Sequence, residues 1–95
     1  MKRRLSKSLY TPEWEALCLI LRRLRESKGI TQSALSELLK QPQSFVSKIE
    51  SGQRKLDLRQ FVIYVRGLGE DPVPVFRRFM GAFDEAERTG KPSRK

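Results

Sequence analysis

The segment over residues 31–52, TQSALSELLKQPQSFVSKIESG, constrains the fold of this chain more than any other. Its first threonine is a good helix N-cap, its apolar residues recur at helical spacing, and its closing glycine is a typical helix stop. Pro42 disfavours helical geometry in the residue before it, which places a turn at residues 40–41. The segment therefore predicts two short helices, over residues 31–39 and 42–50, joined by a tight turn.

Three further helices are expected around this segment. One runs from Thr11 to Lys28, because threonine followed by proline suits a helix start and a glycine follows as a stop. Another runs over residues 57–68 and is capped by its aspartate, and a third begins at residues 71–72. The apolar side chains of the 57–68 helix are expected to form one inward stripe: Leu58, Phe61, Val62, Val65 and Leu68.

The predicted fold class is all-α, a compact five-helix arrangement in a single domain. No segment of the 95 residues alternates apolar and polar side chains as a half-buried strand would. The domain is expected over residues 10–83, preceded by a flexible basic arm over residues 1–9. Residues 84–95, acidic and then basic, are expected to form a largely disordered tail.

Composition narrows the classes of function. The net charge is +9, from 20 basic and 11 acidic residues, which favours a polyanionic partner. The chain has no histidine and one cysteine, so we expect no metal site, no intrachain disulfide and no enzymatic activity, and a reducing cytoplasm suits it. No apolar run approaches the roughly 18 residues that a membrane span needs, so we expect no membrane partner.

The positive charge is segregated along the chain, as a nucleic-acid-binding surface requires. Acidic residues gather at residues 13–15, 70–71 and 84–87. Basic residues open the chain (Lys2, Arg3, Arg4 and Lys7), end the first predicted helix (Arg22, Arg23, Arg25 and Lys28) and flank the second half of the 31–52 segment (Lys48, Arg54, Lys55 and Arg59). The alternative is a solvated surface with an accidental excess of positive charge.

These motifs resemble the lambda repressor/Cro-type helix-turn-helix, known as the XRE family. The family pattern appears as Ile30-Thr31-Gln32, then Leu35-Ser36, then Val46-Ser47-Lys48-Ile49-Glu50-Ser51-Gly52. The resemblance covers about residues 14–76 and implies a sequence-specific DNA-binding protein. Lys40 stands where the family often has glycine, so it must accept an uncommon backbone conformation or the turn must differ slightly.

The resemblance makes the second helix of the motif the reader of DNA bases. Gln43 and Ser44 begin this helix; glutamine can pair bidentately with adenine, and serine with several bases. Ser47 and Lys48 lie one turn further along. The lysine could reach guanine or only a phosphate.

Other polar residues are expected at the DNA backbone. In relatives the residue at the place of Gln32 contacts a phosphate and braces the first base-reading residue. The loop residues Gln53, Arg54 and Lys55 correspond to a phosphate-binding loop. The basic arm over residues 1–9 could enter a minor groove or be attracted only loosely to phosphate.

Two expectations concern structure rather than DNA contact. The resemblance implies a partly buried salt bridge between Arg25 and Glu50, which would tie the first helix to the end of the base-reading helix. Cys18, in an apolar helix, is expected to be a small core or interface residue.

The apolar residues of the base-reading helix differ in expected role. Val46 and Ile49 should lie in the core, on the side opposite the readers. Phe45 could pack at the edge of the core or touch a thymine methyl group.

A second stripe of apolar residues lies late in the chain and contains Phe76, Phe79, Met80 and Phe83. Its helical spacing and its position after the motif suggest a dimer interface. Packing within the domain is the alternative.

We therefore expect a transcription regulator, acting as a repressor, that binds double-stranded DNA at a two-fold symmetric operator as a homodimer and needs no cofactor. An antitoxin that neutralises a toxin through residues 75–95 and autoregulates its operon is the alternative. A third possibility is a protein-interaction module that has lost DNA binding. The intact Gln32, Gln43, Ser44 and Arg54 argue against it.

Overall fold

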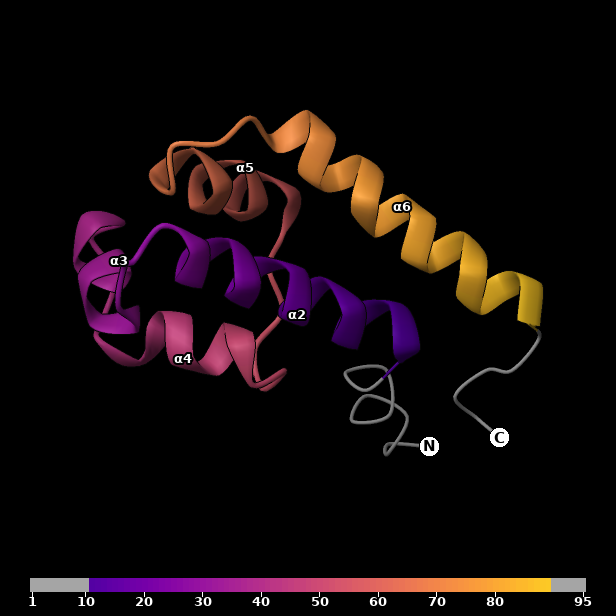
Figure 1. Cartoon of the computed structure of the whole chain (residues 1–95). Helices are drawn as coiled ribbons and strands as arrows, with labels where there is room; N and C mark the ends of the chain where they lie inside the picture. The colour runs from indigo at the N-terminus through magenta and orange to yellow at the C-terminus, as the bar shows by residue number, and fades with distance from the viewer. Residues whose placement is uncertain (1–10, 90–95) are drawn as a thin grey trace.

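The computed structural model describes residues 11–89 and contains five helices and no strand in that range (Figure 1). The helices are α2 (Pro12–Ser27), α3 (Gln32–Leu38), α4 (Ser44–Glu50), α5 (Leu58–Gly67) and α6 (Pro72–Thr89). The all-α prediction is confirmed. The long helices α2 and α6 pack on each other, α4 lies against one side of α2, α3 packs on α4, and α5 lies beside α6.

The predicted helix starts are confirmed by hydrogen bonds. The hydroxyl of Thr11 accepts from the backbone N–H of Trp14 (3.3 Å), and that of Thr31 accepts from Ala34 (3.0 Å). Asp57 forms a reciprocal capping box with Gln60 at the start of α5. Each such cap stabilises its helix by about 1 kcal/mol, so these residues set where the helices begin.

The turn between α3 and α4 forms as expected, at a lysine in the left-handed region. Lys40 has φ 59°, while the N–H groups of Lys40 and Gln41 donate to Glu37 and Ser36 carbonyls. Ser36 is fully buried; its hydroxyl accepts from the N–H of Val46 (3.1 Å) and donates to the Gln43 carbonyl (3.3 Å). Helix α4 begins at Ser44, two residues later than the predicted start at residue 42, because the chain first makes a tighter turn there.

The core lies between α2 and the four other helices. Its fully buried apolar side chains come from every helix: Leu21, Leu35, Val46, Ile49, Tyr64, Val65 and Val75. The core assignment of Val46 and Ile49 is confirmed. At Gly67, a Cβ atom would stand 2.8 Å from the Leu39 Cδ2 atom, so a larger residue there would require the Leu39 side chain to move.

Two predictions about the elements are wrong. Leu58 is 71% exposed rather than part of the inward stripe, because the first turn of α5 lies at the rim of a groove that α2 and α6 do not fill. Tyr64, which that stripe left out, is fully buried. Helix α6 continues to Thr89, past the expected domain end at residue 83, because residues 84–89 contain no glycine or proline and an Arg88–Glu85 ion pair supports the last turns.

The arm over residues 1–9 and the tail beyond residue 89 lie outside the described residues. Among the helices of residues 11–89, none is both long and apolar enough to cross a membrane.

Candidate nucleic-acid interface

Helix α4 has one buried and one exposed side. Phe45, Val46 and Ile49 are buried in the core. The side chains predicted to read bases are exposed on the other side: Gln43 and Ser44 at the start of the helix, and Ser47 and Lys48 one turn on. The helix therefore presents a polar row to solvent while its apolar row fixes it to the domain.

The first predicted reader is held by a neighbouring helix. The Gln43 Nε2 group donates to the Ser33 hydroxyl at 3.0 Å. This bond uses one of the two amide N–H groups. The other N–H and the Oε1 atom remain as a donor and an acceptor pair, which is the pair that adenine N7 and N6 require.

The expectation that Gln32 braces this reader is wrong in this structure. The Gln32 Nε2 group instead donates to the Glu50 Oε1 atom at 2.9 Å. A carboxylate is a stronger acceptor than a neutral amide, so the buried Glu50 captures Gln32. Ser33, the next residue, takes the bracing role, and only its proximity to Gln43 in space reveals it.

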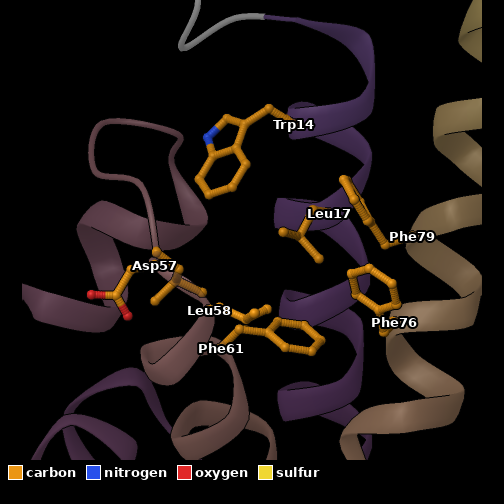
Figure 2. Close-up of a pocket in the computed structure, with 8 residues that line it drawn as sticks. Trp14, Leu17, Asp57, Leu58, Phe61, Phe76 and Phe79 are labelled. Atoms are coloured by element: carbon orange, nitrogen blue, oxygen red, sulfur yellow. The ribbon is translucent and has the colours of Figure 1, made fainter.

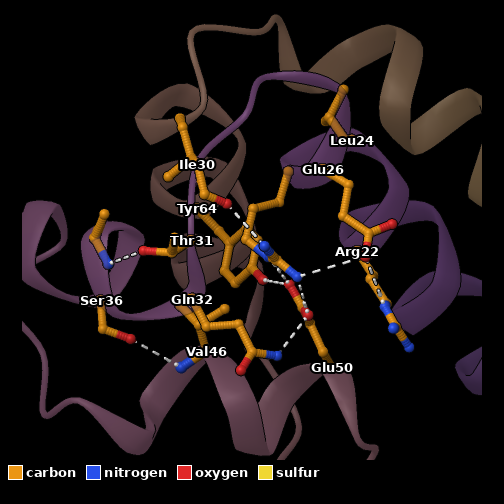
Figure 3. Close-up of polar contacts among 12 residues, drawn as sticks. Arg22, Leu24, Glu26, Ile30, Thr31, Gln32, Ser36, Val46, Glu50 and Tyr64 are labelled. Carbon is orange, nitrogen blue, oxygen red and sulfur yellow. Dashed lines mark hydrogen bonds and ion pairs between the residues drawn. The ribbon is translucent and has the colours of Figure 1, made fainter.

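Glu50 lies at the centre of a polar network that joins four helices (Figure 3). The Arg25 Nε and Nη2 groups donate to its two oxygens at 2.6 and 3.0 Å, and the Tyr64 hydroxyl donates to Oε2 at 3.2 Å. The side chains of Arg25 and Glu50 are 10% and 3% exposed. Arg25 also donates to the Ile30 carbonyl at 2.7 Å, so its guanidinium is bonded on two sides.

The network keeps Glu50 ionised. Burial alone would raise the pKa of this carboxyl group, but the hydrogen bonds from Arg25, Gln32 and Tyr64 hold its pKa below the ordinary value of 4.5. The hydrogen bond to Glu50 raises the pKa of Arg25, and burial followed by the Glu50 charge raises that of Tyr64. The Arg25–Glu50 pair therefore exists as an ion pair that fixes the end of α4 to α2.

The loop after α4 is bonded back to that helix. Gly52 has φ +82°, and the N–H groups of Gln53 and Arg54 both donate to the Lys48 carbonyl, at 2.9 and 3.2 Å. The side chains of Gln53, Arg54 and Lys55 are exposed. The three predicted phosphate-binding residues thus stand immediately beside the exposed row of α4.

Two of these cations lie over aromatic rings. The Arg54 Cζ atom is 5.1 Å from the centre of the Phe45 ring, and the Lys55 Nζ atom is 5.9 Å from that of Trp14. Phe45 is only 7% exposed, which favours packing at the edge of the core over contact with a thymine methyl group.

The basic residues at the end of α2 differ from those beside α4. Arg22 pairs with Glu26 at 3.2 Å, and Lys28 pairs with Glu70. Within residues 11–89, no acidic side chain lies at ion-pair distance from Lys48, Arg54 or Lys55. The cations beside the polar row of α4 therefore have no acidic partner among the described residues, in contrast to Arg22 and Lys28.

The predicted dimer residues on α6 are only partly covered. Phe76 is 41% exposed, while Phe79, Met80 and Phe83 are half-buried. The rings form a chain of contacts that begins at Phe61 of α5 and runs through Phe76 and Phe79 to Phe83, with centroids 5.8 to 6.2 Å apart. Figure 2 shows Phe76 and Phe79 facing Trp14 and Leu17 across an apolar groove. Part of the stripe thus packs within the domain and part faces solvent.

Cys18, the one cysteine, is buried in the side of α2 that faces the domain. Burial, with a smaller contribution from the nearby Glu15 charge, raises the pKa of its thiol to about 11. The side chain therefore stays protonated and acts as a small core residue.

Residues 21–74 match the helix-turn-helix family. An XRE-family like protein from Pseudomonas syringae pv. tomato str. DC3000 is 34% identical, with 84% of this chain and 93% of that chain covered and a TM-score of 0.70. The clp gene regulator ClgR from C. glutamicum is 26% identical, with 74% and 90% covered and a TM-score of 0.66. The wild-type restriction-modification controller protein C.Esp1396I, 21% identical with 75% and 93% covered and a TM-score of 0.67, shares the fold. No curated protein matches this chain.

Proposed function

Because this chain belongs to the XRE family of helix-turn-helix proteins, we propose that it is a transcription regulator that binds a two-fold symmetric operator as a homodimer and represses transcription. The single observation that carries the proposal is the exposed row of Gln43, Ser44, Ser47 and Lys48 on α4, beside cations that have no acidic partner within residues 11–89. A row of small polar side chains fits the donor and acceptor groups of a major groove.

Each residue of the surface has a distinct role in this proposal. Gln43, with its amide fixed by Ser33, reads adenine, and Ser44 reads the neighbouring base. The cations of Arg54 and Lys55 bind backbone phosphates, which add affinity but no sequence preference. Gln32 donates one N–H group to Glu50, which holds the end of α4, and its second N–H group is proposed to contact a backbone phosphate.

The homodimer is proposed from the partly exposed aromatic stripe on α6. One base-reading helix contacts only a few base pairs, so a single domain binds with little specificity. Two domains related by a two-fold axis double the contacts when their reading helices stand about 34–36 Å apart. Phe76, 41% exposed beside half-buried Phe79 and Phe83, provides an apolar surface for such pairing. Repression follows if the dimer occupies DNA that the transcription machinery needs.

An antitoxin is the second candidate function, because the groove beside α6 leaves apolar side chains open to another protein. Leu58 is 71% exposed and Phe76 is 41% exposed at that groove. A toxin seated there would occupy the surface that the dimer model assigns to a second copy.

Selection of bound duplexes from random DNA tests the proposal. We expect recovered sequences to share two half-sites related by a two-fold axis, with centres about 10–10.5 base pairs apart. Sedimentation of the complex should give two chains per duplex. Recovery of unrelated sequences, or of a single half-site bound by one chain, would contradict the dimeric operator model.

A further inference from the structure

We propose that Phe45 is a positioning residue for DNA binding, whose ring holds the Arg54 guanidinium ready for a backbone phosphate. This inference rests on the proposed function, since it assigns a role within the same DNA-binding surface. It gives Phe45 a task that neither core packing nor base contact describes.

The geometry of the pair supports this role. The guanidinium carbon lies 5.1 Å from the ring centre, inside the range of about 6 Å over which a cation is attracted to an aromatic face. Phe45 is 7% exposed, whereas Arg54 is exposed. A planar guanidinium on a ring keeps the N–H donors along its edge available for a phosphate.

The backbone places both partners on one rigid unit. Phe45 lies in the first turn of α4, and the N–H group of Arg54 donates to the carbonyl of Lys48 in the last turn. The helix therefore carries the ring and the cation together. When α4 docks in a groove, Arg54 arrives with its side chain already placed beside the duplex.

Holding the arginine in advance lowers the entropy lost on binding. A free arginine side chain samples many rotamers and loses most of them when it binds a phosphate. Lys55 shows a weaker form of the same arrangement, with its ammonium group 5.9 Å from the centre of the Trp14 ring on α2. Its distance lies at the limit of the attraction, so the proposal concerns Arg54.

The test compares Phe45→Leu, Arg54→Ala and the double variant in binding to a selected duplex and to random duplex DNA. Leucine keeps an apolar side chain in the core but removes the aromatic face. We expect Phe45→Leu to weaken both affinities by about 3-fold to 10-fold and to leave the selected sequence unchanged. In the Arg54→Ala background, Phe45→Leu should have no further effect.

Arg77→Ala is the matched control, because it also removes one exposed positive charge but lies on α6. The affinity cost of Phe45→Leu should be the same with or without Arg77. If Phe45 acts only by shaping the core, Phe45→Leu will weaken binding equally in the wild-type and Arg54→Ala backgrounds and will alter the selected sequence. That result would overturn the inference.

A measurement on the free protein completes the test if Phe45→Leu fails to fold. The ring current of Phe45 should shift the Arg54 side-chain proton resonances upfield in the wild type, and Arg54→Lys should bind DNA more weakly despite its equal charge. Unshifted resonances would overturn the inference while leaving the proposed function standing. Failure of the wild type to bind any duplex at low salt would instead overturn the proposed function.

Discussion

The end of α4 and the stripe on α6 differ in how their side chains are satisfied. Around Glu50, charged and polar groups from four helices bond to one another, and the side chains of Arg25, Glu50 and Tyr64 are almost fully buried. Along α6, large aromatic side chains contact each other, yet Phe76 stays 41% exposed. The polar groups around Glu50 find their hydrogen-bond partners within one chain. The α6 stripe instead leaves apolar surface that another molecule can cover. The end of α4 is therefore held in place by its own chain, while the α6 stripe leaves apolar side chains uncovered.

Loss of the Glu50 carboxylate should have the largest effect. Glu50→Ala leaves Arg25 buried without its partner and removes the acceptor of Gln32 and Tyr64, so the free energy of unfolding should fall by about 3–5 kcal/mol. Chemical denaturation of Arg25→Ala, Glu50→Ala and the double variant gives the coupling energy. A coupling energy near zero would mean that the Arg25–Glu50 pair does not stabilise the folded chain.

The same network predicts an acid-dependent loss of stability. Because the pKa of Glu50 is lower in the folded chain than its ordinary value of 4.5, its contribution is fully present above that value. It is lost as the pH falls through the lower folded pKa. Glu50→Gln, compared with wild type by denaturation from pH 7 to pH 2, should flatten this part of the profile, and identical profiles would contradict the assignment.

Disruption of the α6 stripe should weaken operator binding without unfolding the domain. Phe76→Glu places a charge on a partly exposed side chain, so we expect a folded monomer whose operator affinity falls on the order of 100-fold. Circular dichroism and analytical ultracentrifugation measure the two properties. Pro74→Glu, exposed on the opposite side of α6, is the control and should remain dimeric. An unfolded Phe76→Glu chain would show that the stripe is core after all.

Removal of the first base reader should cost less. Gln43→Ala should weaken binding to the selected duplex by about 1–3 kcal/mol and leave random DNA almost unaffected. Ser33→Ala, which removes only the brace, should relax the preference at the same base pair with a smaller loss of affinity. Competition binding with single-base variants measures both changes, and an altered preference at another position would remove Ser33 from this role.

The smallest effect is expected at the turn. Lys40 has φ 59°, a conformation that disfavours a side chain, so Lys40→Gly should raise the free energy of unfolding by up to about 1 kcal/mol. Thermal unfolding measures the change. Since the exposed Lys40 is absent from the proposed contacts, operator affinity should not change, and a weaker complex would place this lysine on the DNA.

The sequence by itself determined where α2, α3 and α5 begin and where the turn between α3 and α4 falls. Thr11, Thr31 and Asp57 cap them, and Pro42 with Lys40 marks the turn, because these preferences act between residues fewer than five positions apart. The match to the family pattern further predicted the pairing of Arg25 with Glu50 across the fold. Such signals are readable along the chain without knowledge of its packing.

Only the tertiary structure decided which partners the remaining side chains took. Gln32 bonds to Glu50 rather than to Gln43, Ser33 replaces it as the brace, and Arg54 lies on Phe45. Leu58 stays exposed although its spacing matched an inward stripe, because no neighbouring helix reaches it. In each case several partners compete in space, and their distances and burial, which depend on how helices pack, settle the outcome.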